Sequence, residues 1–395
     1  MRSCLRTNVL GLLYLFLLVG GQPLLAQTPS DRAVTINLRD YGWQPPGRHE
    51  IDRPSLAIDK QDRVIVGFTV RARPGLATRN QPSLDFHILR FLPDGKRDVS
   101  LALPNGNESL PTNAAGKTGI YLSDTNQIIA RANGNFQTLV SDADGSPPTT
   151  WKVVAPCLSQ WCIFAQSPSR KTLLVNSTGA DPPLTLIRLS GQSTFQSCGN
   201  AHASTEDSIQ NHPRSITDEF AYSTESSGSE TFSYRWPLCD YEHRIELPLP
   251  AHSFPAKVLN DQMFVARRYD NRSDKMGIEV ISFSGQSIFR PTLAKHETVP
   301  TFPPIQSSER GDRIAADVVT VRGGNQRLDI GWHITSRRIA VYDISARNEV
   351  ASVPAELKYR YHFEFDLSPD GHRLVILEDD SLRIVDLDQY VKDKP

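Results

Sequence analysis

The sequence has no excess of charge of either sign, and this excludes two classes of partner. Its 43 Lys and Arg residues are matched by 44 Asp and Glu residues, so the formal net charge is −1. Proteins that bind nucleic acid or an anionic membrane surface through a broad electrostatic field carry a basic excess. The sequence therefore predicts neither nucleic-acid binding nor membrane-surface binding.

Long hydrophobic runs are also missing beyond the N-terminus. The apolar run from Val9 to Val19 is shorter than the roughly 20 residues that a membrane-spanning helix needs. Basic residues precede this run, and Leu24-Leu25-Ala26 follows it, which is typical of a secretory signal peptide. We therefore expect residues 1–26 to be cleaved as a signal peptide. The mature protein is expected to be secreted or periplasmic, to be a monomer, and to have no transmembrane segment.

Cysteine is scarce, with five residues in the chain, and Cys4 lies within the expected signal peptide. The remaining Cys157, Cys162, Cys198 and Cys239 are an even set, which favours two disulfides in an oxidising compartment. Three pairings are possible, and we expect Cys157–Cys162 as a local link and Cys198–Cys239 as a link between neighbouring repeats. A metal-binding Cys pair at 157 and 162 is the alternative. No Cys-x-x-Cys or His-x-x-x-His motif completes such a site, so no metal site is predicted.

The short motifs of several enzyme classes are absent. The chain contains no Gly-x-Ser-x-Gly, no His-Glu-x-x-His and no glycine-rich phosphate loop before a helix, so no cofactor is predicted. The segment from Ser141 to Trp151 ends in Thr-Trp, as the Asp boxes of sialidase propellers do. Its Ser-x-Asp-x-Gly spacing is broken, however, and no second copy occurs. A sialidase is therefore not the preferred interpretation.

The clearest structural signal is the stretch from Phe363 to Leu387. Phe363, Phe365 and Leu367 alternate with polar residues, which predicts a strand with one apolar face. Ser-Pro-Asp-Gly at 368–371 has turn chemistry, and the apolar run 374–377 predicts a second, buried strand. A second turn at Asp379-Asp380 leads to a third strand over residues 381–387. Three short antiparallel strands with tight turns are expected here.

Similar units recur along the chain. Residues 186–195 (LIRLSGQSTF) and 280–289 (VISFSGQSIF) are nearly the same hairpin sequence, and HILRFLPDGK, AVYDISARNE and LRIVDLDQ occupy equivalent places in other units. Units of roughly 40–60 residues are typical of propeller repeats. The stretch 363–387 resembles the WD40-like and TolB-like propeller repeats, although the Gly-His and Trp-Asp pairs of true WD40 repeats are missing. The resemblance implies an exported β-propeller, a fold shared by binding proteins and enzymes.

We therefore predict an all-β protein, a seven-bladed β-propeller of four-stranded antiparallel blades. Residues 27–390 form the propeller, the sixth repeat begins at Arg313, and residues 391–395 are a C-terminal tail. The alternating segment 33–38 stands alone before the first repeat, while the last repeat has only three strands. We expect this N-terminal strand to complete the last blade, because ring closure leaves no exposed sheet edge. Two β-sandwiches are the alternative, disfavoured because the repeats continue without a linker.

Basic residues recur near the expected beginnings of the inner strands, which would line a central funnel. This arrangement favours an anionic ligand at the ring axis; the residues are Arg53, Lys117, Arg214, Lys257, Arg313, Arg360 and His362. The alternative is that they are ordinary loop cations, neutralised by neighbouring acidic residues; the candidates are Asp52, Asp218, Asp261, Asp312 and Glu364.

The preferred functional interpretation is a binding or interaction module whose partner is a protein or a small anionic ligand. Its docking face would consist of the loops leading into the inner strands and the loops joining second to third strands. No catalytic residue is assigned. The first alternative is an enzyme with its active site in the funnel, such as a lyase, a glycosidase or a quinone-dependent dehydrogenase. The second is a purely structural envelope protein.

Overall fold

The structure of the protein is a computed structural model. It describes residues 33–43, 55–71, 84–101, 109–112, 119–132, 135–140, 150–156, 162–177, 184–189, 194–198, 215–227, 230–250, 252–270, 275–300, 305–322, 333–355, 364–378 and 380–391. The chain divides into two units, Met1–Ala33 and Val34–Pro395. All that follows concerns the second unit, together with Ala33, where its first strand begins.

In the described residues the strands form seven antiparallel sheets, six of four strands and one of five. The first sheet contains β2 (Ser55–Ile58), β3 (Val64–Arg71), β4 (Leu84–Phe91) and β5 (Ser109–Thr112). The second contains β6 (Gly119–Leu122), β7 (Ile128–Ala132), β8 (Asn135–Val140) and β9 (Thr150–Pro156). The third contains β10 (Cys162–Gln166), β11 (Thr172–Ser177), β12 (Leu184–Arg188) and β13 (Thr194–Cys198).

The remaining sheets continue this order along the chain. The fourth contains β14 (Ser215–Ile216), β15 (Phe220–Ser227), β16 (Glu230–Pro237) and β17 (Ile245–Glu246). The fifth contains β18 (Ser253–Val258), β19 (Met263–Asp270), β20 (Lys275–Ser282) and β21 (Ser287–Phe289). The sixth contains β22 (Glu297–Thr298), β23 (Gln306–Ser307), β24 (Arg313–Arg322), β25 (His333–Asp343) and β26 (Asn348–Ala355). The seventh contains β27 (Glu364–Leu367), β28 (Arg373–Glu378), β29 (Ser381–Asp386) and β1 (Ala33–Asn37).

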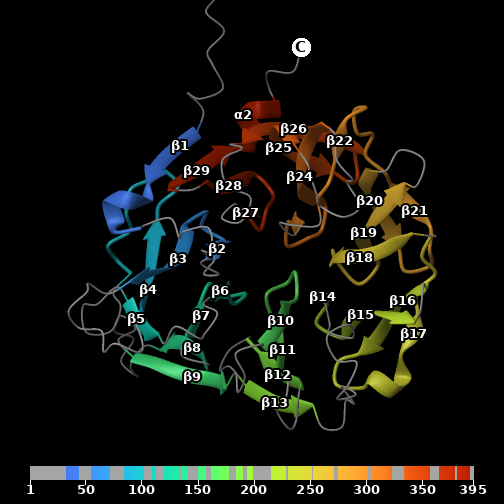
Figure 1. Cartoon of the computed structure of the whole chain (residues 1–395). Helices are drawn as coiled ribbons and strands as arrows, with labels where there is room; N and C mark the ends of the chain where they lie inside the picture. Colours follow the sequence, from blue (N-terminus) through green and yellow to red (C-terminus); the bar gives the residue numbers. More distant parts are fainter. Residues whose placement is uncertain are drawn as a thin grey trace, which may run out of the picture. The chain divides into compact units, whose positions relative to one another are not determined.

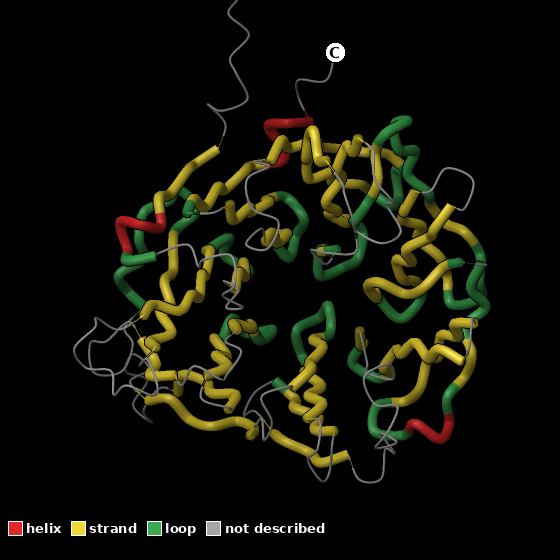
Figure 2. The backbone as a smooth tube through the Cα atoms, viewed as in Figure 1, coloured by secondary structure: helices red, strands yellow, loops and turns green. Residues whose placement is uncertain are grey.

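The sheets are arranged as a β-propeller. The strands β2, β6, β10, β14, β18 and β27 lie nearest the common centre, and the last strands lie outside (Figures 1 and 2). Contacts between β2 and β6, between β10 and β14, between β14 and β18, and between β27 and β2 join neighbouring sheets at the inside. Two short 3₁₀ helices, η2 (Leu38–Tyr41) and η4 (Tyr241–His243), and one α-helix, α2 (Leu387–Val391), complete the described elements.

The sixth sheet differs from the predicted four-stranded pattern. Its inner position is divided between β22 and β23, both of which pair with β24. Pro300, Pro303 and Pro304 stand between these two short strands in the sequence, and proline cannot donate a ladder hydrogen bond. Arg313 therefore begins the second strand of its sheet, and the prediction that the sixth repeat begins with Arg313 was wrong.

The N-terminal strand β1 lies beside β29 in the seventh sheet, as the sequence predicts. The Leu38 amide donates to the Asp380 carbonyl at 2.7 Å, and the Arg39 side chain pairs with the Asp380 carboxylate. Ile36 and Leu38 pack in a buried apolar cluster that also contains residues of the first and seventh sheets. The two ends of the unit are therefore joined by backbone pairing and by a shared core.

Apolar layers between neighbouring sheets form the core. Val66 and Phe68 of the first sheet share a cluster with Val375 and Ile384 of the seventh. Comparable clusters link the first and second, second and third, third and fourth, fourth and fifth, and fifth and sixth sheets. Because alternate residues of a strand point to opposite faces, each middle strand contributes to two layers. The short apolar runs in the sequence are these middle strands.

One turn is repeated after the inner strands. The amide of its fourth residue donates to the carbonyl of its first, and the fourth residue has a positive φ; the fourth residues are Asp62, Asn126, Arg170, Gly311 and Gly371. The first residue is Asp or Ser in each case, and its side-chain oxygen accepts from the backbone amide that begins the next strand segment. This turn recurs in the first, second, third, sixth and seventh sheets.

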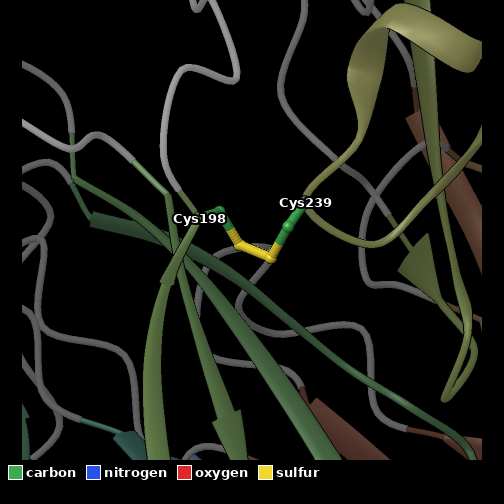
Figure 3. Close-up of a disulfide and its surroundings, with 2 residues drawn as sticks. All are labelled: Cys198 and Cys239. Atoms are coloured by element: carbon green, nitrogen blue, oxygen red, sulfur yellow. A yellow bond between two sulfur atoms is a disulfide. The ribbon is translucent and has the colours of Figure 1, made fainter.

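A disulfide joins Cys198, the last residue of β13, to Cys239, which follows β16 (Figure 3). It links the third and fourth sheets, and the predicted pairing of these two residues is confirmed. The other predicted pair, Cys157–Cys162, includes Cys157, which lies outside the described residues.

Candidate functional site

The candidate site begins with Arg170, the fourth residue of the repeated turn in the third sheet. Its φ is +63°, a conformation that glycine adopts in the equivalent turns of the sixth and seventh sheets. A non-glycine residue in this region is uncommon and costs free energy. The Arg170 Nη1 donates to the Ile58 carbonyl at 2.6 Å, although Ile58 belongs to the first sheet. The turn of the third sheet therefore carries a guanidinium that reaches the first sheet.

Asp366 of β27 meets the same residue of the first sheet. Its Oδ2 accepts from the Ile58 amide at 3.2 Å, and its Oδ1 accepts from the Leu367 amide at 2.9 Å. Ile58 is fully buried and uses both of its backbone groups in this way. It therefore bridges the Asp366 carboxylate and the Arg170 guanidinium.

Lys257 of β18 completes a set that we name the axial cluster: Arg170, Lys257 and Asp366. Burial raises the pKa of the Asp366 carboxyl above its ordinary value, while attraction to Arg170 and Lys257 acts in the opposite direction. Burial lowers the pKa of the Lys257 ammonium, and Asp366 opposes this shift. Burial also lowers the pKa of Arg170. Arg170 also interacts with Glu309 and Asp59, which are paired with Lys60 and Arg63 respectively. With those two pairs counted as neutral, Arg170 and Lys257 are opposed by the single carboxylate of Asp366.

A second polar level lies two residues earlier on β27. Glu364 and Asp366 point to the same side of the strand because side chains alternate. Glu364 interacts electrostatically with Tyr121 of β6, whose pKa is raised chiefly by burial, and Arg131 of β7 opposes that shift. Arg131 is itself 1% exposed. Charged and phenolic groups from the second and seventh sheets therefore adjoin the axial cluster.

Ion pairs connect the turns that follow the inner strands. Lys60 pairs with Glu309 at 3.1 Å, joining the first and sixth sheets, and Arg373 pairs with Asp62 at 2.8 Å, joining the seventh and first. Arg313 donates to the Gly371 carbonyl at 2.9 Å. These contacts join the turns that follow Ile58 and Asp366 to each other and to the equivalent turn of the sixth sheet.

The structure corrects where the predicted basic residues lie. Lys257 is the fifth of six residues in β18, and Arg313 begins a second strand, so both lie at the far end of the inner strands from the predicted positions. Arg313 contacts a neighbouring turn, whereas Lys257 faces Asp366. The other predicted ligand-binding residues lie outside the described residues: Arg53, Lys117, Arg214, Arg360 and His362.

The acidic residues proposed as neutralising partners have mixed roles. Asp218 accepts hydrogen bonds from the hydroxyls of Ser169 and Thr172, and Asp312 accepts from Ser308. These carboxylates stabilise the repeated turns instead of pairing with the predicted cations. Asp366, which does face Lys257, was not among the candidates.

Arg170 and Asp366 were missed by sequence reasoning, yet a signal for Arg170 exists. Ser-Pro-Ser-Arg at 167–170 has the same spacing as Ser-Pro-Asp-Gly at 368–371, with arginine in place of glycine. A bulky residue where the repeat has a positive φ indicates a specific use of that side chain.

The described part of the chain contains no group of three or more His, Cys, Asp or Glu residues placed to hold a metal ion. In the same residues, no helix reaches the length and apolar character of a membrane span.

Comparison with known proteins adds three likenesses to solved structures. The β-propeller domain of the Trilobed protease from Pyrococcus furiosus aligns with 87% of this chain and all of its own, at 10% identity and a TM-score of 0.47. An oligogalacturonate lyase from Vibrio parahaemolyticus aligns over 91% of this chain and 100% of its own, at 8% identity and a TM-score of 0.44. TolB from Acinetobacter baumannii aligns over 82% and 79%, at 14% identity and a TM-score of 0.37.

No protein-family model matches the chain, and no curated protein matches it. The likenesses concern fold alone, and none of them extends to function.

Proposed function

We propose that the protein is an exported β-propeller binding module that holds a small anionic ligand at the axial cluster. The observation that carries this proposal is that Arg170, linked to Asp366 through Ile58, and Lys257 both interact electrostatically with this one carboxylate. A cation removed from water attracts an anion more strongly than a solvated one does. The ligand would supply the negative charge that this cluster lacks.

The proposal includes a closed ring of all seven sheets acting as blades, with β1 completing the last one. It also includes cleavage of a signal peptide at 1–26, a propeller over 27–390 and a tail at 391–395. The Cys198–Cys239 disulfide supports export, because disulfides persist in oxidising compartments. Arg53, Lys117, Arg214, Arg360 and His362 remain proposed members of the ligand-binding funnel.

The test is a binding titration of the full mature chain with sulfate, inorganic phosphate, acetate and succinate, followed by calorimetry. We expect at least one anion to bind, Lys257→Met to weaken it at least tenfold, and Asp366→Asn to strengthen it. Lys96→Met is a matched control because Lys96 is exposed and pairs only locally with Asp94. Equal affinities of the Lys257→Met variant and the wild type would contradict the proposal.

A second candidate is an enzyme that uses the same cluster. The pKa of Lys257 is lowered and that of Asp366 is raised, and opposite shifts of neighbouring groups are typical of acid–base sites. The bound anion should be recovered after incubation and analysed by NMR. Unchanged ligand favours the binding module, whereas conversion that Lys257→Met abolishes favours the enzyme.

A further inference from the structure

A cleft of about 400 Å³ lies at the outer edge of β20, in the fifth sheet. It is lined by residues of β19 and β20 and by the segment after β21, and the polar residues and the glycine among them are Arg268, Asp270, Lys275, Gly277, Arg290 and Thr292. The joining ends of β19 and β20 belong to the docking face defined from the sequence. The cleft is at the end of β19 and the start of β20, whereas Lys257 is near the end of β18, which runs antiparallel to β19. The cleft is therefore separate from the axial cluster.

The cleft exists because β21 is much shorter than β20. β21 pairs only with Val280 and Ile281, and the chain then leaves the sheet at Arg290 and Pro291. Farther along β20, the amide and carbonyl of Met276 bond to Thr298 and Val299 of the next sheet. Strand alternation directs the Ile278 amide and carbonyl to this same edge. They lie between the pairing of Val280 with β21 and the hydrogen bonds of Met276. The cleft is thus a gap in an otherwise occupied sheet edge.

Cations outnumber carboxylates in the lining of the cleft. Arg268 pairs with the buried Glu279 at 3.1 Å, and Glu279 also accepts from the Ser287 hydroxyl at 2.5 Å. The Lys275 Nζ donates to the Ala294 carbonyl at 2.9 Å, which uses one of its three donors. Arg290 is exposed. Among the lining residues three are cations and one, Asp270, is a carboxylate. Two carboxylates lie behind them: Glu279 pairs with Arg268, and Glu297, which pairs with Arg338, also interacts with Lys275.

Gly277 leaves the floor of the cleft open. Its φ is not positive, and a Cβ placed on it would meet only the Arg268 carbonyl, at 4.0 Å. The backbone of β20 therefore does not require glycine here, and the missing side chain matters for the space above the strand. In this register Gly277 lies opposite Arg268, so the open space adjoins the guanidinium.

We propose that this cleft binds a small organic molecule through a single carboxylate group. The volume lies within the range of small-molecule sites, roughly 300–1,000 Å³. Arginine presents paired N–H groups that match a carboxylate, and Lys275 adds further donors. Pro291 and Leu293 line the same cleft and accommodate an apolar body. The proposal does not depend on ligand binding at the axial cluster.

The experiment uses benzoate as the probe, with benzamide as the neutral molecule of the same shape and phenyl phosphate as the phosphate analogue. Binding to the full mature chain is followed by calorimetry and by NMR shifts of the Gly277 amide. We expect saturable benzoate binding, at least tenfold weaker benzamide binding, and phenyl phosphate no tighter than benzoate. Gly277→Phe should abolish benzoate binding, and Arg290→Gln should weaken it several-fold.

Gly277→Ala is the matched control, since a methyl group fits the open space and the variant should fold and bind. Thermal unfolding of Gly277→Phe verifies its fold, and Lys96→Met, at an exposed lysine outside both sites, should leave benzoate binding at Gly277 unchanged. Equal binding of benzoate and benzamide, tighter binding of phenyl phosphate, or full benzoate affinity in folded Gly277→Phe would overturn the proposal. An absence of benzoate binding to the wild type would overturn it as well.

Discussion

At the scale of single residues, the core contains a buried ion pair between Asp317 of β24 and Arg337 of β25. Their side chains are 1% and 2% exposed, and Arg337 Nε lies 3.2 Å from Asp317 Oδ1. Burial raises the pKa of Asp317 from its ordinary 3.8 to about 6, although Arg337 acts to lower it. Desolvation therefore outweighs the attraction of the partner.

This pair predicts a defined pH dependence of stability. The pKa of Asp317 is higher in the folded state, so the folded protein binds more protons than the unfolded chain between pH 3.8 and about 6. Its contribution to the free energy of unfolding should fall as pH rises through that window and stay low above it. Relative to Asp317→Asn, the wild type should lose roughly 1–3 kcal/mol between pH 4 and pH 7.

Denaturant unfolding of both proteins at several pH values measures this difference, with the exposed Asp261→Asn as control. Parallel pH profiles for the wild type and Asp317→Asn would show that the carboxyl does not titrate in that window.

At the scale of elements, β1 is the segment on which the seventh sheet depends. A chain that starts at Leu38 lacks β1 and leaves the outer edge of β29 unpaired, and an unpaired edge can pair with another chain. It also loses Ile36, which is 7% exposed, from the shared apolar cluster. Loss of this side chain and of the partly buried Val34 should cost about 2–5 kcal/mol.

The matched control is a chain that starts at Ala33 and keeps the whole strand. We expect this control to resemble the mature protein in denaturant midpoint and in elution volume. The chain that starts at Leu38 should unfold earlier and self-associate. Similar behaviour of the two truncated chains would mean that β1 contributes little.

The same scale shows what could be predicted from the sequence. Strict alternation at 363–367 and 33–37 and the apolar run at 374–377 predicted β27, β1 and β28, because a half-buried strand imposes a period of two. The divided inner position of the sixth sheet was missed, since β22 and β23 have two residues each and no period. The partnership of Arg170 and Asp366 was missed because it joins the first, third and seventh sheets, and contacts between distant sheets leave no local pattern in the sequence. The arginine in the turn 167–170 is the one local signal.

At the scale of the whole molecule, the Cys198–Cys239 disulfide is the covalent link between two sheets. The residues are 41 apart in sequence, and closing a loop of that length in the unfolded chain corresponds to about 4 kcal/mol of stabilisation. We expect the double variant Cys198→Ser, Cys239→Ser to unfold at lower denaturant concentration. A reducing agent should lower the denaturant midpoint of the wild type by breaking this bond. The variant lacks the bond and should not lose stability in this way.

Cys157→Ser with Cys162→Ser is the matched control for the replacement of two cysteines: it keeps the Cys198–Cys239 bond and should stay sensitive to reductant at that bond. A wild type whose stability does not respond to reductant would exclude a stabilising role for the Cys198–Cys239 bond.

The pairing of β1 with β29 also has a consequence for how the protein is made. β1 precedes its partner β29 along the chain, and the contact between Arg39 and Asp380 beside them spans 341 positions. Contacts between distant parts of a chain form slowly, because a long loop must close first. The seventh sheet can therefore be completed only once β29 has been synthesised, and a copy that ends before β29 leaves β1 without its strand partner.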